Sequence, residues 1–359
     1  MATKSNLHNL TAIQSKQDMS SRQESTGSTE NAPGGRPRHL LSKLQQHGNF
    51  TLAYGGLVQD CLSYFETDQG YLPYAKKWRY CFALGDPVAP TEHWPKLVDE
   101  FIKKFKRPAF VQASEGLAEL ISQQPKYYVT EFGYDTYLWL KNYDFSGKSK
   151  ERLRYAWNWL TTRGYRFEEK QGAAIPCDEV QNVSGAWRKT RTIKRREVVF
   201  LNRPLVPEHE LDVRKFFLYD ADNRMVAFAF FDPMYQNGKV MGYTTAIKRR
   251  IPDAPVYAET GLVKHAIEQF KTEGIQLVTL GLAPLAGLEN RRFRANPLLA
   301  RSWKYGFNAR WLNRFFYNLQ GHAQYKNHFY GEKVMTYFCS PGLVEDLRII
   351  SLLKLMRVF

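Results

Sequence analysis

The sequence lacks the long apolar runs, paired cysteines and leader segment that characterise several common classes of protein. The longest candidate for a membrane span, Met225 to Phe231, has seven residues and stops at Asp232, whereas a spanning helix needs about 20. The four cysteines form no CxxC pair, which argues against a zinc ribbon and a disulfide scaffold. The N-terminus has no apolar leader, so we expect a cytoplasmic protein, peripheral to the membrane at most.

Familiar catalytic motifs are absent as well. The chain has no GxSxG, Walker, GxGxxG or HExxH motif, which leaves the common hydrolase, nucleotide and zinc-protease sites without support. The eight histidines are scattered, and the spacing of six between His322 and His328 fits no common metal-binding helix. We therefore predict neither a metal site nor a cofactor.

Positive charge is abundant. Lysine and arginine number 51 against 35 acidic residues, a net charge of +16, which indicates either an anionic partner or a protein that tolerates non-specific binding. Basic and aromatic residues alternate in two stretches, residues 187–196, which include Arg195, and residues 291–316, which include Arg292. Such stretches suit an RNA backbone with unpaired bases or an anionic membrane surface. A solvated helix face whose apolar side lies in the core is the simpler alternative.

Alternating helix-like and strand-like segments predict a mixed α/β fold. We expect a disordered tail over residues 1–42, a first domain over 43–147, a second domain with the catalytic site over 148–345, and a basic amphipathic segment over 346–359. Apolar residues from Trp94 to Phe105 follow one helical face. The C-terminal segment fits either an interfacial helix or a helix docked on the core.

A strand, connector, helix and strand follow one another between Lys239 and Leu280, as in a βαβ unit. The loop from Gly281 to Gly287 then lies at the carboxyl end of the second strand, where α/β sheets place ligands. Its small residues allow a substrate to approach the backbone closely, and its amides can bind an oxyanion. A tight turn leaving a strand would have the same composition.

At this loop the sequence resembles a known family. Residues 280–289, LGLAPLAGLE, are similar to the LGMAPLSGLE signature of the aminoacyl-phosphatidylglycerol synthases, the lysyl- and alanyl-phosphatidylglycerol transferases of the multiple peptide resistance type. Four further stretches resemble the family's motifs in order: ALGDPV at 83–88, FSGK with LR at 145–154, the R-x-x-PDAP connector at 249–255, and FYNLQG with YK at 316–326. The resemblance covers roughly residues 45 to 343.

The resemblance implies tandem GNAT-like acyltransferase domains, with mixed central sheets flanked by helices. It also implies aminoacyl-tRNA as the donor and an anionic phospholipid membrane as the partner that carries the acceptor hydroxyl. The catalytic residues that we carry over or infer are Lys326, Arg249 and Glu289, the last as a group that recognises the aminoacyl ammonium. The substrate-binding residues are Gly281, Pro284, Gly287, Tyr325, Arg195 and Arg292.

One departure from the family pattern keeps alternatives open. The best-known members have Asp three residues before the connector arginine, where this chain has Ala246, which can act neither as acid nor as base. A GNAT-like enzyme that uses an acyl thioester is one alternative, although the connector from Arg249 to Pro255 has no glycine to cradle a pyrophosphate. A non-catalytic nucleic-acid or membrane adaptor is the other.

Overall fold

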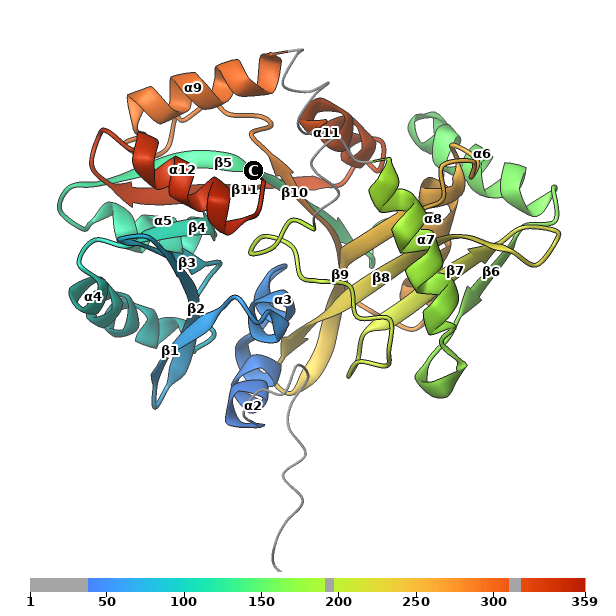
Figure 1. Ribbon diagram of the computed structural model, residues 1–359, viewed down its shortest axis with the longest axis horizontal. Coiled ribbons are helices and arrows are strands. Elements are labelled where there is room, and N and C mark those ends of the chain that lie inside the picture. The colour runs from blue at the N-terminus through green and yellow to red at the C-terminus, as the bar shows by residue number, and fades with distance from the viewer. Residues whose placement is uncertain (1–37, 191–196, 310–317, 359) are drawn as a thin grey trace, which may run out of the picture.

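The computed structural model describes residues 38–190, 197–309 and 318–358 (Figure 1). Its strands are β1 Ser63–Thr67, β2 Gly70–Lys77, β3 Tyr80–Leu84, β4 Ala109–Ala113, β5 Tyr127–Trp139, β6 Arg166–Glu169, β7 Arg214–Tyr219, β8 Met225–Gln236, β9 Lys239–Arg250, β10 Leu277–Pro284 and β11 Glu332–Pro341. Its α-helices are α2 Arg38–His47, α3 Ala53–Val58, α4 Trp94–Phe105, α5 Glu115–Ser122, α6 Glu151–Thr161, α7 Cys177–Lys189, α8 Ala258–Thr272, α9 Pro297–Asn308, α11 Leu319–Asn327 and α12 Asp346–Leu355.

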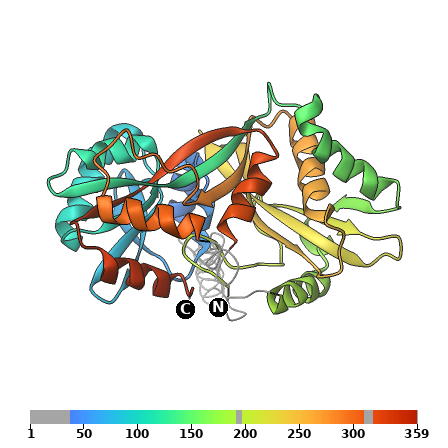
Figure 2. The ribbon, with the colours of Figure 1, turned by 90° about the horizontal axis from the view of Figure 1, so that it is seen from above.

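The eleven strands form one sheet, in the order β1-β2-β3-β4-β11-β5-β10-β9-β8-β7-β6. The pairs β3–β4 and β9–β10 are parallel and the other neighbours are antiparallel. In the half that contains β1–β4, helices α4 and α5 lie on one side and α9 and α12 on the other (Figure 2). The prediction of a mixed α/β fold with a central sheet flanked by helices is confirmed.

The long strand β5 joins the two halves of the sheet. It pairs with β11 along one edge and with β10 along the other. β11 is the last strand along the chain, yet it lies between β4 and β5 and completes the sheet of the first half. Residues 332–341, which the sequence analysis assigned to the second domain, therefore pair with strands of the first.

The N-terminal helices close one end of the β8–β9 hairpin. Of the predicted tail, residues 1–37 lie outside the described part of the chain, whereas residues 38–42 begin helix α2. Leu40 and Leu44 on α2 are fully buried. The amide of Gly238 donates to the carbonyl of Gln45 at 2.9 Å, so the tip of the hairpin is held by the end of α2.

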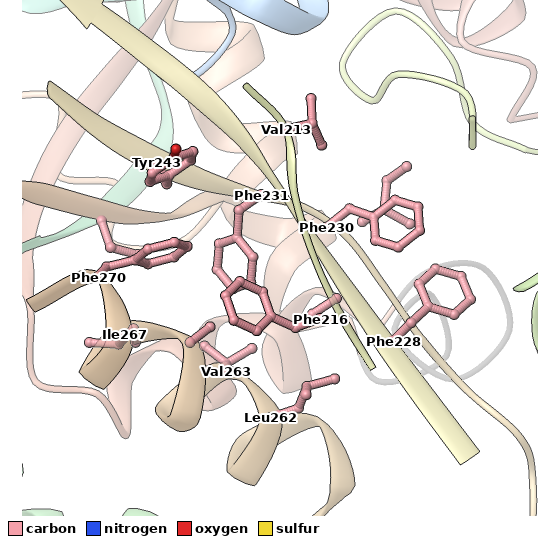
Figure 3. Close-up of a cluster of buried hydrophobic side chains, with 14 of the residues drawn as sticks. Val213, Phe216, Phe228, Phe230, Phe231, Tyr243, Leu262, Val263, Ile267 and Phe270 are labelled. Carbon is pink, nitrogen blue, oxygen red and sulfur yellow. The ribbon is translucent and has the colours of Figure 1, made fainter. Parts of the chain in front are cut away.

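Helix α8 supplies the core of the second half. Its residues Leu262, Val263, Ile267 and Phe270 face β7, β8 and β9 (Figure 3). The ring of Phe270 stacks on Tyr243 with centroids 4.5 Å apart and meets Phe216 and Phe231 edge-on, at 5.5 and 5.2 Å. Such aromatic pairs add about 0.5–1.5 kcal/mol each beyond the burial of their area. This packing fixes α8 against β7, β8 and β9.

A buried ion cluster fastens the segment before β7 to the sheet. Arg203 donates to Asp232 on β8 at 2.8 Å and to Glu210 at 2.9 Å, and Lys215 on β7 lies 3.0 Å from Glu210. The four side chains are almost completely excluded from solvent. Because each charge has a partner, the cluster is tolerated, but the loss of one member would leave a buried charge uncompensated.

We expect Arg203→Met to lower the free energy of unfolding by about 3–5 kcal/mol, since Asp232 and Glu210 would lose the guanidinium that balances them. Urea unfolding at neutral pH measures this difference. Arg224→Met is the matched control, because Arg224 makes two ion pairs at the surface, with Asp220 and Asp253. Equal unfolding midpoints for the two variants would contradict a stabilising role for the cluster.

Candidate active site where two strands diverge

Two parallel strands separate near the middle of the sheet. β9 and β10 pair only through Gly242–Thr244 and Leu277–Thr279. β9 then has a bulge beside Ala246 in its pairing with β8, and β10 shifts register against β5 between Thr279 and Leu282. Gly281 lies in that shift with φ +75°, a conformation that glycine adopts without strain. The facing backbone edges of β9 and β10 beyond Thr244 and Thr279 therefore have no strand pairing with each other.

Lys326 on α11 reaches into this opening. Its ammonium nitrogen, Nζ, donates to the carbonyl oxygens of Gly281, at 2.6 Å, and Leu282. The side chain is buried. Burial lowers the pKa of Lys326 to about 7, helped by nearby Lys248 and opposed by Asp135. Near neutral pH the amine thus exists in both protonation states, as acid–base chemistry requires.

Among the described residues, Lys326 differs from every other buried cation. Each of the others forms an ion pair with a carboxylate: Arg203 with Asp232, Lys215 with Glu210, Arg249 with Glu197, Lys264 with Glu268 and Arg348 with Glu345. Lys326 has two carbonyls instead, and the carboxylate of Asp135 acts on it through the electrostatic field. Burial lowers this pKa, and two carbonyl oxygens, which stabilise an ammonium less than a carboxylate does, do not offset the effect.

Asp135 on β5 is the buried carboxylate of the site. It accepts hydrogen bonds from the hydroxyl of Thr51 and from the backbone amide of Thr136, the latter at 2.7 Å. Burial raises the pKa of Asp135, although Lys326, Thr51 and the amide of Gly281 oppose the rise. The carboxylate is therefore held between α11, β10 and the segment that precedes α3.

A chain of threonines crosses the sheet beside Asp135. The hydroxyls of Thr51 and Thr279 are 3.2 Å apart, and Thr279 donates to Thr244 at 2.8 Å. These contacts link the N-terminal segment, β10 and β9 at the last paired position before the strands diverge. The polar groups at the base of the opening thus satisfy one another in the low-dielectric interior.

Lys248 on β9 carries a second positive charge near Lys326. Its Nζ lies 3.5 Å from the ring centroid of Tyr325 and 3.3 Å from Glu259 at the start of α8. Burial opposes the charge, yet Tyr325 and Glu259 outweigh it and raise the pKa of Lys248. Lys248 therefore stays protonated where Lys326 titrates, and its charge favours the neutral form of Lys326.

The predicted glycine loop borders a cavity. Residues from Leu285 to Arg291 and from Lys304 to Asn308 enclose about 480 Å³, and Gly287 and Glu289 are among them. The carboxylate of Glu131 accepts hydrogen bonds from the backbone amides of Glu289 and Asn290, with N···O distances of 2.5 and 2.7 Å, and so fixes the loop. The side chain of Glu289 is exposed and lies 3.2 Å from Arg291. Pro284 ends β10 and pairs with Gly133 on β5.

The other predicted site residues lie elsewhere. The guanidinium of Arg249 packs against α7, donating to Ser184 and to Glu197 at 2.8 Å, with the ring of Trp187 4.7 Å away. Its neighbour Lys248 faces α8 and α11, so the two point to opposite sides of β9. Arg292 forms an exposed ion pair with Glu115 on α5. Arg195 lies outside the described residues.

A second, smaller cavity of about 210 Å³ lies beside Tyr325. Its lining includes Arg152, Thr260 at the start of α8, and His328 after α11. Within the described ranges, no group of three metal-ligating side chains converges. No helix in the same ranges has the length and apolar content needed to cross a bilayer.

Residues 41–340 match the family described as phosphatidylglycerol lysyltransferase, C-terminal. The chain belongs to this family. The family resemblance noted in the sequence is thereby confirmed.

Over the aligned residues, the chain is about a quarter identical to curated relatives. A phosphatidylglycerol lysyltransferase of Bacillus subtilis is 24% identical over 302 residues, which cover 81% of this chain and 33% of the relative. A lysylphosphatidylglycerol biosynthesis bifunctional protein, LysX, of Nocardia farcinica is 26% identical over 300 residues, or 76% of this chain and 25% of the relative. The chain therefore spans about a third or less of the length of these relatives.

Two solved structures have the same fold. L-PGS from Bacillus licheniformis superposes with a TM-score of 0.72 at 19% identity, covering 91% of this chain and 98% of that one. The C-terminal domain of a putative lysylphosphatidylglycerol synthetase from Agrobacterium fabrum gives 0.71 at 20% identity, covering 88% and 94%.

Sequence reasoning did not identify Asp135, Thr51 or Lys248 as members of the site. Asp135 carried one signal, since an acid within the apolar run from Phe132 to Leu140 is unusual for a buried strand. Thr51 carried none, because its role depends on a contact with residues 84 and 228 positions away.

The lowered pKa of Lys326 predicts a pH-dependent stability. Between pH 7 and 10.5 the unfolded chain binds a proton at Lys326 that the folded chain does not, so the unfolding free energy rises with pH. The rise is at most about 1.4 kcal/mol per pH unit. We expect Lys326→Met to lose this part of the pH dependence. Urea unfolding of the unaltered protein and of Lys326→Met at pH 7 and pH 9 measures this contribution. If the unfolding free energies of the two proteins change equally with pH, Lys326 stays charged in the folded state.

Proposed function

We propose that the chain transfers an aminoacyl group from aminoacyl-tRNA to a hydroxyl of phosphatidylglycerol or a similar membrane lipid. The observation that carries the proposal is the buried amine of Lys326 at the divergence of β9 and β10, which donates to two backbone carbonyls and lies in the field of Asp135. Family membership supports the lipid acceptor, since the curated relatives are named for lysyl transfer to phosphatidylglycerol. The net charge of +16 suits two polyanionic substrates.

The reaction is an ester exchange. The lipid hydroxyl oxygen attacks the carbonyl carbon of the aminoacyl ester while its proton passes to neutral Lys326 Nζ. The tetrahedral intermediate then collapses, and the bond between the carbonyl carbon and the ribose oxygen of the tRNA breaks. The proton returns from Lys326 to that ribose oxygen, so the amine is regenerated and no other reactant is consumed.

The hydrogen bonds of Lys326 suit this proton transfer. A neutral amine has two N–H groups and one lone pair, and the carbonyls of Gly281 and Leu282 accept two N–H groups. The lone pair is then left to receive a proton. The same two contacts hold Nζ at one place in the opening, which removes the rotational freedom of a surface lysine.

Asp135 and the strand edges complete the proposed machinery. The negative field of Asp135 favours the ammonium form and so stabilises Lys326 once it has taken the proton. Backbone amides on the edge of β9 beyond Thr244, which have no pairing with β10, are suitable donors to the oxyanion. Asp135 also supplies a buried carboxylate in a site where this chain has Ala246 in place of the family's aspartate.

The remaining predicted residues take supporting roles in this proposal. Glu289, at the edge of the 480 Å³ cavity, is placed to attract the ammonium of the aminoacyl group. Arg249 orders the segment around Glu197 against α7 and so acts as a positioning residue. We place the reaction at the cytoplasmic face of the membrane, where charged tRNA and lipid headgroups meet.

Replacement of Lys326 tests the mechanism. We expect Lys326→Met to reduce kcat for transfer from aminoacyl-tRNA to phosphatidylglycerol by at least about a hundredfold, because the proton acceptor is lost. In the unaltered protein kcat should rise with pH through about 7 as the ammonium deprotonates. Mass spectrometry of the lipid product, at a series of pH values, measures both.

Lys333→Met is the control, because Lys333 is an exposed lysine on β11. It should retain the activity and pH profile of the unaltered protein. Transfer from an acyl-coenzyme A, and not from aminoacyl-tRNA, would favour the thioester alternative. Full function of Lys326→Met in cells would favour a non-catalytic adaptor.

Asp135→Asn separates a positioning role from a merely structural one. Removal of the carboxylate withdraws the field that raises the pKa of Lys326, so the rise of kcat with pH should move to lower pH. A structural defect would lower kcat at every pH and leave the midpoint in place. The pH profile of the variant, compared with that of the unaltered protein, distinguishes the two.

A further inference from the structure

Exposed large apolar side chains gather on one face of the molecule. Twelve such side chains are exposed in the described part of the chain, and seven of them lie on α9, on α12 with the loop before it, and on the β2–β3 turn. Their exposed fractions run from 39 to 76%. These seven residues, here called the α9–α12 face, are Trp78, Leu298, Tyr305, Leu343, Val344, Leu347 and Ile350.

Hydrogen bonds join the parts of this face. Asn296, which caps α9, donates to the carbonyls of Gly342 and Leu343 at 3.1 and 3.0 Å and so ties the start of α9 to the loop before α12. Ser351 on α12 donates to the carbonyl of Lys77 at 2.8 Å, next to Trp78. Both ribbon views place α9 and α12 beside each other (Figures 1 and 2).

The inner sides of the two helices already supply the core. Leu299 and Trp303 of α9 and Leu352 of α12 are buried in one cluster with Phe338 of β11. Buried Arg348 pairs with Glu345 and donates to the carbonyl of Arg107 at 3.1 Å, which fixes α12. The outward apolar residues lie outside this buried cluster, and a group of exposed apolar residues on one face is typical of a surface that binds a partner or a membrane.

The charges on this side are almost all positive. Helix α9 contributes Arg301 and Lys304 and contains no acidic residue. Helix α12 contributes Lys354, which lies 5.9 Å from the ring of Trp78, and Asp346 is its one acidic residue. Apolar side chains among lysines, arginines, a tryptophan and a tyrosine match the boundary of an anionic bilayer, where chains enter the lipid and cations meet headgroups.

We propose that the α9–α12 face docks on the surface of a bilayer that contains anionic lipid. Lys304 belongs both to the positive border of this face and to the wall of the 480 Å³ cavity beside the glycine loop. Docking by this face thus brings the cavity mouth to the headgroup layer. The inference goes beyond the proposed reaction, and vesicle binding tests it without any donor.

The test uses the purified chain and vesicles of equal parts phosphatidylglycerol and phosphatidylcholine. We expect the unaltered protein to sediment with these vesicles, less so at high salt, and weakly with phosphatidylcholine alone. Leu347→Glu with Ile350→Glu should weaken binding at least about tenfold, because two exposed apolar side chains that would enter the lipid are replaced by carboxylates that anionic headgroups repel. Arg301→Glu on α9 should weaken it independently.

Leu211→Glu with Tyr330→Glu is the matched control, since both residues are exposed and apolar but lie outside the α9–α12 face. This control should bind vesicles as the unaltered protein does. Circular dichroism checks that each variant folds. Equal vesicle binding by the α9–α12 variants and the unaltered protein overturns the proposal. Self-association that the same variants abolish without lipid also overturns it, in favour of a contact between two copies.

A monomeric, short-chain phosphatidylglycerol separates docking from catalysis. The Leu347→Glu, Ile350→Glu variant should transfer to this soluble acceptor at the rate of the unaltered protein and lose transfer to vesicles. If neither the unaltered protein nor the variant shows transfer, the proposed reaction is wrong. The vesicle-binding result still tests whether the α9–α12 face docks on the bilayer.

Discussion

The site depends on one constraint, the burial of a lysine amine that, within the described part of the chain, forms no ion pair with a carboxylate. Lys326 meets two backbone carbonyls, and these are available because β10 bends at Gly281 and leaves β9. A straight, fully paired β10 would direct the same carbonyls into the β-ladder. The bulges, the positive φ of Gly281 and the docking of α11 are therefore parts of one arrangement, which keeps an amine able to exchange protons near neutral pH.

The halves of the chain meet at the same place. β5 carries Asp135 and pairs with β10, while Thr51 approaches from the N-terminal segment and Lys326 from α11. Groups far apart in sequence thus depend on one another for their hydrogen bonds, and a change in one alters the electrostatics of the others. Because the core of α8 on β7–β9 is packed aromatic against aromatic, the surrounding frame resists relaxation around the polar groups.

The sequence patterns predicted individual helices and strands better than the contacts between distant segments. The apolar stripe from Trp94 to Phe105 matched α4, and the strand–helix–strand unit that leads to the glycine loop matched β9, α8 and β10, since periodicity and caps act within a few residues. The insertion of β11 between β4 and β5, and the contact of Thr51 with Asp135, depend on contacts between segments far apart in the chain, which local patterns do not encode. Arg249 and Lys248 show a subtler limit: adjacent residues on a strand face opposite sides, so a motif with both cations does not tell which of them reaches the site.

The lysines and arginines behind the net charge of +16 include two physically different groups. Buried cations such as Arg203 and Arg249 are neutralised by carboxylates within the fold and hold segments in place, so they attract no external anion. Exposed cations such as Arg301 and Lys304 border an apolar face. In the proposed docking, their attraction to anionic lipid adds to the free energy gained when the apolar side chains leave water. Lys326 belongs to neither group, since it is buried but not neutralised. This environment, which differs from that of the paired buried cations and from that of the exposed ones, is what makes Lys326 suited to take up and release a proton.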